Sequence, residues 1–439
     1  MIAPRPGDGA ATGTDDEPPC VDCAEESALP HLELHRERPL LAVLAGIQFT
    51  HIVDFMIMMP LGPQFMALFG IGPTQFSLLV ASYTLSAGLV GLVAALFIDR
   101  FDRRHALLAL YAGFIAATLA CGLAPGYAWL LAARAAAGAF GGVLGASVFA
   151  IVGDVIPESR RGAAMGTVMS AFSLAAVAGV PIGLVLANAY GWRAPFLFLT
   201  AVSLAIAAFV PRCVPRLSRH VRQAAARSAV AQVTEVVGHR NHLRAFALIA
   251  ALTLSAFAII PFISPYMVAN VGLTLDDLPL IYLAGGSMTL FTARLIGHLA
   301  DRHGKRRVFV ATALLSLVPI LLVTHLPAAP LGAAIAVTTL FMVLVSGRFV
   351  PAMAMITASV EPRLRGSFMS VHASVQQFGS SVATLGAGLV IGRSADGALT
   401  HYGTVGWAAA MATVLAVLIG RTLRSAARAA PAAGKVTGA

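Results

Sequence analysis

Charged residues are scarce in this chain of 439 amino acids, of which they make up 11%. A soluble domain carries about 25% charged residues, so a soluble globular protein is excluded. The mean hydropathy of +0.82 agrees with this, because few polar side chains are left to cover a surface that faces water. Both values favour a membrane protein.

Cysteine is also rare, with four in the chain. Cys121 and Cys213 lie singly among apolar residues, and Cys20 and Cys23 form one CxxC pair. A structural zinc site needs four ligands, so the pair predicts no metal centre. The sequence also lacks a glycine-rich nucleotide loop and a nucleophile–base arrangement. We therefore expect no cofactor and no enzyme activity.

Apolar runs are absent from residues 1–38, which hold nine acidic residues and three arginines. This segment resembles neither a signal peptide nor a folded domain. Its composition predicts a disordered tail, and we expect a second tail at residues 424–439.

Apolar runs fill the rest of the chain. A transmembrane helix needs about 20 apolar residues, and twelve such stretches lie between Pro39 and Arg424. Six lie in residues 39–211 and six in residues 245–423, on either side of a polar linker, 212–244, that contains seven arginines. We therefore predict an all-α polytopic membrane protein with twelve transmembrane helices in two halves.

The basic residues are distributed unevenly between the loops. Of the 30 lysines and arginines, 25 lie in the tails and in alternate loops, and Arg193 and Arg393 are the two in the opposite loops. Positive loops face the cytoplasm, so both termini and the linker are expected there, in a bacterial inner membrane. This topology accounts for the net charge of +10, and no nucleic-acid partner is needed.

The two halves carry related loops. Asp99-Arg100-Phe101-Asp102-Arg103-Arg104 follows the second span, and Asp301-Arg302-His303-Gly304-Lys305-Arg306-Arg307 follows the eighth, 202 residues later. Arg161-Gly162 after the fourth span returns as Arg365-Gly366 after the tenth, 204 residues later. Internal repeats of this kind are typical of secondary transporters, whose substrate site lies between the repeats near the bilayer midplane.

These loops identify a family resemblance. Gly297 through Arg307 resembles the loop motif of the major facilitator superfamily, and Arg134-x-x-x-Gly138 resembles its basic motif in the fourth span. Gly179-Val180-Pro181-Ile182-Gly183 resembles the fifth-span motif of its drug:proton antiporter and arabinose-efflux-permease-like branch. The resemblance implies two pseudo-symmetric six-helix halves, alternating access and a monomeric exporter.

The resemblance also implies roles for the motif residues. Salt bridges from the loop carboxylates would hold the cytoplasmic gate closed, although the charges could instead mark topology alone. The glycines and the proline of the fifth span would allow a bend, or simply close helix packing. The expected gating residues are Asp99, Arg100, Arg103, Gly297, Asp301, Arg302 and Arg306, and the expected bend residues are Gly179, Pro181 and Gly183.

One carboxylate, Asp54, lies deep inside a span, with His51 one turn earlier on the same face. Ionisable residues within the bilayer are costly and usually functional. Burial favours the neutral form of a carboxyl group, and histidine titrates near neutral pH. Asp54 and His51 are therefore the candidates for proton coupling, and the alternative is a purely structural pair.

Further polar residues within spans are the candidates for substrate binding. The buried arginines need anions, and either Asp54 or an anionic substrate would serve. Polar residues of the eleventh span share a face and suit hydrogen bonds, either to a substrate or between helices. The candidates are Arg134, Arg348, His372, Gln376 and Gln377.

These observations favour a secondary active transporter that exports small amphipathic or sugar-like molecules in exchange for protons. The alternative is a proton-coupled uptake symporter for an organic anion, which Arg134 and Arg348 would favour. The expected partners are a small-molecule substrate, protons and the lipid bilayer. No residue pattern supports a membrane-embedded enzyme or a receptor.

Overall fold

The computed structural model describes residues 34–94, 101–215 and 229–426. Most of the predicted N-terminal tail, with Cys20 and Cys23, lies outside the described residues, as do part of the linker and the end of the C-terminal tail. The helices of the first half are α2 (Leu34–Ile57), α3 (Gly62–Leu68), α4 (Pro73–Ala94), α5 (Arg103–Gly122), α6 (Tyr127–Val155), α7 (Glu158–Leu174), the π-helix η2 (Ala175–Gly179), α8 (Val180–Tyr190) and α9 (Ala194–Cys213).

A short linker helix, α11 (Ala229–Gly238), precedes the second half. That half contains α12 (Arg240–Phe257), η4 (Ile260–Phe262), α13 (Ile263–Ala269), η5 (Leu275–Asp277), α14 (Leu278–His303), α15 (Lys305–Leu315), α16 (Leu317–Thr324), α17 (Leu331–Gly347), α18 (Phe349–Ala358), η6 (Pro362–Leu364), α19 (Arg365–Val390), the hairpin of β1 (Gly392–Arg393) and β2 (Leu399–Thr400), and α20 (Tyr402–Thr422).

Prolines and glycines set many of the helix ends. Pro73, Pro181 and Pro195 lie in the first turn of α4, α8 and α9, where a missing N–H costs no hydrogen bond. Gly191 and Gly304 have φ angles of +87° and +92° and follow the last residues of α8 and α14. Such angles favour glycine, so these residues end the helices.

Eleven helical segments of the described chain are long and apolar enough to span a membrane. The twelfth span is α19, whose 26 residues are long enough but include the polar His372, Gln376 and Gln377. The expected all-α fold with twelve transmembrane helices in two halves is confirmed.

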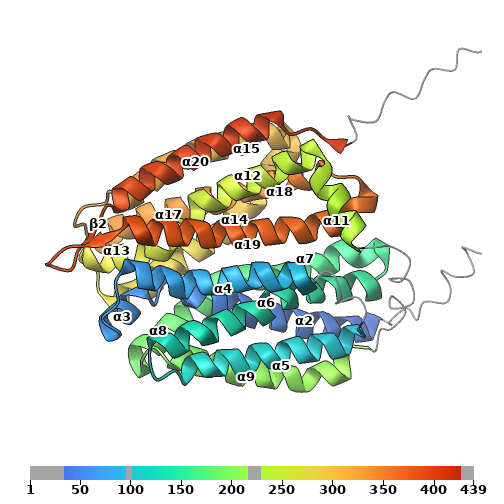
Figure 1. Ribbon diagram of the computed structural model, residues 1–439, viewed down its shortest axis with the longest axis horizontal. Coiled ribbons are helices and arrows are strands. Elements are labelled where there is room, and N and C mark those ends of the chain that lie inside the picture. Colours follow the sequence, from blue (N-terminus) through green and yellow to red (C-terminus); the bar gives the residue numbers. More distant parts are fainter. Residues whose placement is uncertain (1–33, 95–100, 216–228, 427–439) are drawn as a thin grey trace, which may run out of the picture.

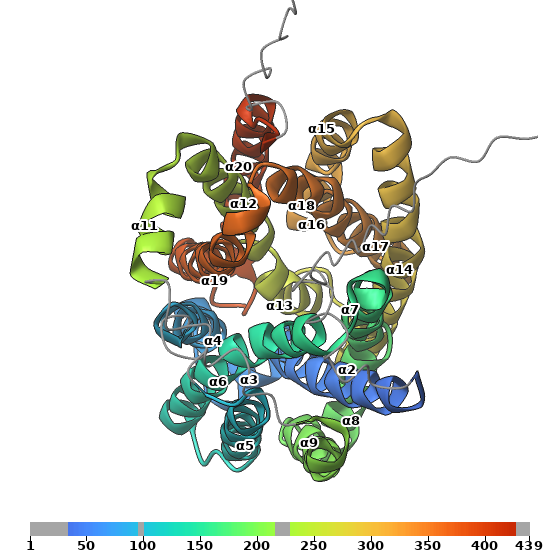
Figure 2. The ribbon, with the colours of Figure 1, turned by 90° about the vertical axis from the view of Figure 1, so that its right-hand side faces the viewer.

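The two halves lie side by side, with the first half below and the second above in Figure 1. They meet along two seams. In one, α4 packs against α19, and in the other, α14 packs against η2 and α8 (Figure 2). We call the end of the bundle at which α5, α11, α15 and α19 begin the basic end, and the other end the opposite end.

Among the described residues, the largest apolar cluster joins the two halves at the opposite end. The largest buried cluster includes Phe76 of the first half and Phe262 of the second, whose rings meet edge to face at 5.7 Å. Nearer the basic end the core divides into one cluster within residues 40–214 and another within residues 236–417. The described conformation is therefore closed at the opposite end.

Hydrogen bonds also join the halves toward the opposite end. Thr74 Oγ1 donates to the Gly388 carbonyl at 2.7 Å, and Thr84 and Ser381 share a 2.7 Å bond between their hydroxyls. On the other seam, Asn188 of α8 donates to the Leu275 carbonyl at 2.9 Å and to Asp276 at 3.0 Å. These bonds hold both seams in register.

Candidate functional site

An ion pair lies in the interior of the first half. Arg134 Nη1 of α6 donates to the Asp54 carboxylate of α2 at 2.7 Å, and both side chains are buried. Thr118 of α5 donates to the second carboxylate oxygen at 3.3 Å. Buried charges need partners of this kind. Three helices thus meet at one charge-balanced site.

A column of aromatic rings connects this pair with the second half. The Arg134 guanidinium lies over the ring of Tyr83, 4.6 Å from its centroid. Tyr83 packs against Phe55 at 5.3 Å, and Phe55 packs against Phe257 of α12 at 6.1 Å. The stack has the geometry of a cation–π contact followed by tilted aromatic pairs. It extends from the ion pair across the boundary between the halves.

His51 lies one turn from Asp54, between Tyr83 and Phe114, with ring centroids 6.3 and 6.0 Å away. Its Nδ1 atom is buried and has no hydrogen-bond partner among the described residues. His51 therefore lies on the same face of α2 as Asp54, as expected, but is not hydrogen bonded to its carboxylate.

Arg348 lies elsewhere in the fold. It stands between α17 and α18 and is fully buried in the second half. Its Nη atoms donate to Thr413 Oγ1 at 2.7 Å, Ser255 Oγ at 3.0 Å and Ser316 Oγ at 3.1 Å. Asp54, the anion considered for it, is paired with Arg134 instead. Neutral hydroxyls therefore solvate Arg348.

Of the three polar candidates on α19, Gln377 lies at the seam with α4. His372 is buried and stacks on Phe368 at 6.4 Å, and its Nε2 has no hydrogen-bond partner among the described residues. Gln376 and Gln377 are half-buried, and a β-carbon on Gly88 of α4 would lie 3.3 Å from Gln377 Cβ. The structure thus places Gln377 at an interface between the halves, apart from the ion pair, with His372 and Gln376 on the same helix.

The expected gating residues lie at the basic end. Asp99 and Arg100 fall outside the described residues. Arg103 at the start of α5 pairs with Asp154 at 3.0 Å, within the first half. In the second half, Arg306 donates to the Arg421 carbonyl, whereas Asp301 and Arg302 are exposed on the last turn of α14, and Gly297 lies two turns before its end.

The expected bend residues lie where the fifth span changes its winding. The π-helix η2 ends at Gly179, and α8 continues through Pro181 and Gly183. A β-carbon on Gly179 would lie 2.3 Å from Val53 Cγ2 of α2, and one on Gly183 would lie 2.7 Å from Ile57 Cδ1. The two glycines thus let the fifth span approach the helix that carries Asp54.

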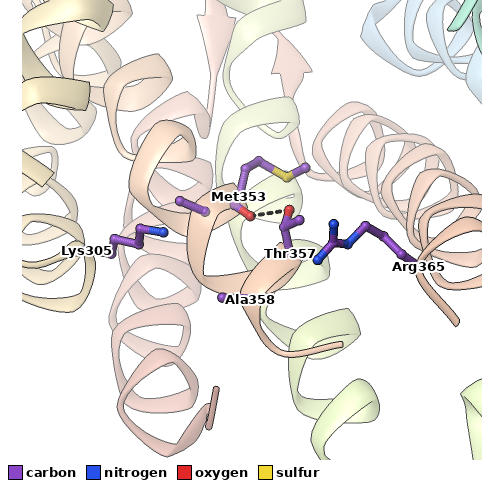
Figure 3. Close-up of a pocket in the computed structure, with 6 residues that line it drawn as sticks. Lys305, Met353, Thr357, Ala358 and Arg365 are labelled. Atoms are coloured by element: carbon purple, nitrogen blue, oxygen red, sulfur yellow. Dashed lines mark hydrogen bonds between the residues drawn. The ribbon is translucent and has the colours of Figure 1, made fainter. Parts of the chain in front are cut away.

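A surface pocket of about 440 Å³ opens at the basic end of the second half. Figure 3 shows Lys305 and Arg365 on either side of Met353 and Thr357, with Thr357 donating to the Met353 carbonyl at 2.8 Å. Because all of its lining belongs to the second half, this pocket is separate from the Asp54–Arg134 pair.

Tyr83 and Thr118 contact the Asp54–Arg134 pair and were not expected from the sequence. Threonine and tyrosine are common in spans and carry no distinguishing pattern. Gln48, whose buried Oε1 atom has no partner among the described residues, could have been noticed in the sequence, because it precedes His51 by three residues and lies one turn from it on α2.

Comparison with known proteins identifies the family. The family model described as Major Facilitator Superfamily matches residues 44–293 and 245–438. The MFS-type transporter YceJ of Bacillus subtilis (strain 168) is 23% identical over 378 residues, which are 86% of this chain and 94% of YceJ. A probable sugar efflux transporter of Mannheimia succiniciproducens is 26% identical over 192 residues, 44% of this chain and 47% of that protein.

Solved structures share the fold at low sequence identity. A D-xylose–proton symporter superposes with a TM-score of 0.70 at 16% identity, covering 88% of this chain and 96% of the symporter. A bacterial homologue of the human lysosomal transporter Spinster, inward-facing and unoccupied, gives a TM-score of 0.65 at 16% identity, with 88% and 95% coverage. Because the family model covers most of the chain, the protein is a multi-pass membrane transporter that belongs to the Major Facilitator Superfamily.

Proposed function

We propose that this transporter works by alternating access, couples to protons through Asp54, and exports small neutral molecules of amphipathic or sugar-like character. The buried pair of Asp54 and Arg134 carries the proposal. A carboxylate in a low-dielectric interior is either paired with a cation or protonated. Exchange between these two states at Asp54 would link proton binding to the conformation of the helices that meet there.

The state of both arginines favours a neutral substrate over an organic anion. Arg134 is already paired with a carboxylate, and Arg348 is held by three hydroxyl groups. Each guanidinium thus already has hydrogen-bond partners within the protein, and its buried Nε atom has none among the described residues. The uptake symporter for an organic anion, which these arginines favoured in the sequence, therefore has less support.

Export is supported by the fifth-span motif around Pro181 and by the partial similarity to a probable sugar efflux transporter. The basic loops support cytoplasmic termini. With that orientation, the conformation closed at the opposite end would be open toward the cytoplasm, where an exporter takes up its substrate.

The test uses inside-out membrane vesicles with an acidified lumen and radiolabelled L-arabinose and lactose as probes. An exporter accumulates its substrate in these vesicles, whereas a symporter for uptake does not. Asp54→Asn should lose accumulation but retain equilibrium exchange of labelled for unlabelled sugar, because asparagine keeps the shape of the side chain and cannot titrate. Asp396→Asn, at an exposed residue of the β1–β2 hairpin, should behave like wild type. Accumulation at the wild-type rate by Asp54→Asn would refute the coupling role and leave His51 or His372 as candidates.

A further inference from the structure

A polar row on α2 continues from the ion pair toward the basic end. Gln48, His51 and Asp54 follow one another at three-residue intervals, so each lies about one turn from the next in a row that winds around α2. Opposite this row lie Gly141 and Gly145 of α6. A β-carbon on Gly141 would lie 2.8 Å from His51 Cδ2 and 2.4 Å from Tyr83 Oη, and one on Gly145 would lie 3.7 Å from Gln48 Oε1. The glycine-lined face of α6 thus gathers the side chains of Gln48, His51 and Tyr83.

Three buried polar atoms at this face have no hydrogen-bond partner in the part of the chain that the structure describes. They are Gln48 Oε1, His51 Nδ1 and Tyr83 Oη. Buried polar atoms in proteins are nearly always hydrogen bonded, because an unpaired one loses its bonds to water without replacement. Three such atoms from two helices at one glycine-lined face point to a ligand with hydrogen-bonding groups.

The chemistry of the three side chains selects the class of ligand. An amide oxygen accepts a hydrogen bond, a phenol both donates and accepts, and a neutral imidazole nitrogen does either according to its tautomer. Neither Gln48 nor Tyr83 carries a charge to attract an ion, and the charges of Asp54 and Arg134 balance each other. The rings of Tyr83 and Phe114 on either side of His51 provide apolar surface. Hydroxyl groups on a compact neutral skeleton match this set.

Resting on the function proposed above, we propose that Gln48, His51 and Tyr83 form the substrate subsite and bind the hydroxyl groups of a neutral, polyhydroxylated molecule. The missing β-carbon of Gly141 makes room for Tyr83 Oη and His51 themselves, so both side chains lie directly against the backbone of α6. The subsite lies one turn from the Asp54–Arg134 pair, so substrate and proton bind to adjacent turns of α2.

The test measures binding of L-arabinose and lactose to purified protein in detergent by thermal stabilisation, with citrate and tetraphenylphosphonium as charged comparisons. Tyr83→Phe should weaken sugar binding about tenfold, the loss expected for one buried hydrogen bond. It should leave the melting temperature of the free protein unchanged or higher, because the removed hydroxyl has no partner among the described residues. Gln48→Leu should act in the same direction.

Tyr111→Phe is the matched control. Tyr111 is a buried tyrosine of the same half, but its hydroxyl bonds with Thr50 Oγ1 at 3.1 Å. Its removal should lower the melting temperature and leave sugar affinity at the wild-type value. The opposite responses of two Tyr→Phe variants separate a binding role from a structural one.

The remaining outcomes each decide the proposal. Sugar binding of wild-type strength in both Tyr83→Phe and Gln48→Leu would overturn the subsite, even if Asp54→Asn still loses coupling. Binding of citrate or tetraphenylphosphonium alone, or of none of the four probes, would overturn the ligand class. Normal sugar binding with loss of proton-driven accumulation in Tyr83→Phe would make the row a proton path. If Tyr83→Phe and Gln48→Leu weaken sugar binding while Asp54→Asn keeps full proton coupling, the subsite is upheld and the coupling proposal is refuted.

Discussion

Arg134 Nη1 holds Asp54 at two points, the side-chain carboxylate at 2.7 Å and the backbone carbonyl at 3.3 Å. The second contact does not depend on the charge of the aspartate. It can therefore persist when the carboxyl group is protonated or replaced by an amide. Arg134 therefore has one contact with α2 that neutralising the Asp54 carboxylate does not by itself remove.

The first prediction concerns the stability of this pair. Arg134→Gln leaves the buried Asp54 carboxylate without its cation, and the free energy of unfolding should fall by about 3–5 kcal/mol. The double variant Asp54→Asn/Arg134→Gln removes both charges and should recover most of the loss. Unfolding in detergent measures both values. A double variant as unstable as Arg134→Gln alone would show that the charge balance is not what stabilises this site.

The second prediction concerns Arg348. Thr413→Val replaces the hydroxyl that accepts its 2.7 Å hydrogen bond with a group of similar shape, and should lower the unfolding free energy by about 1.5–3 kcal/mol, the range for bonds to charged groups. Sugar affinity should not change, because this cluster lies within the second half. Reduced affinity with unchanged stability would instead support the substrate role that the sequence indicates for Arg348.

The third prediction concerns the seam between α4 and α19. Gly388→Ala would place a methyl group 2.1 Å from Ser77 Oγ and 3.0 Å from the Pro73 carbonyl, so it should separate the helices at the opposite end. Spin labels on α4 and α19 at that end should report longer distances. Gly386→Ala is the control, because its methyl group would meet nothing within 4 Å. Equal distances in both variants would show that this seam tolerates the methyl group.

The fourth prediction concerns the loop motif. Asp301 is exposed at the end of α14, and its proposed latch would form only when the basic end closes. Asp301→Asn should therefore reduce transport while leaving the melting temperature and sugar affinity close to wild type. Proteoliposome uptake and thermal unfolding measure the two effects. Wild-type transport would reduce the motif to a marker of topology.

The fifth prediction concerns orientation. In a variant whose four cysteines are replaced by serine, a new cysteine at Asp396 should react with an impermeant thiol reagent in intact cells. One at His303, exposed at the basic end, should react only after the cells are opened. Reaction of the His303 cysteine in intact cells would reverse the proposed topology.

The fold could be predicted because the composition, the lengths of the apolar runs and the repeated loops can be read from the sequence without knowing any tertiary contact. The site could be predicted only in part. Sequence gives the depth of Asp54, Arg134 and Arg348 in the bilayer but not the direction in which each side chain points around its helix axis. Asp54 and Arg134 point toward each other, whereas Arg348 points to the hydroxyls of α12 and α20. Depth alone therefore left Asp54 open to pairing with either arginine, and the packing makes the pair with Arg134.

The aromatic column gives the ion pair a means of sensing the separation of the halves. Its Phe55–Phe257 contact is the one that crosses between them, so rocking that parts these rings would let water reach Tyr83 and the charges behind it. Attraction between unit charges about 4 Å apart is about 4 kcal/mol at an effective dielectric constant of about 20 and about 1 kcal/mol in water. Wetting would therefore loosen Arg134 from Asp54 as the carboxylate gains access to bulk protons. In the proposed mechanism, a single packing contact would then set both the strength of the ion pair and the timing of proton exchange.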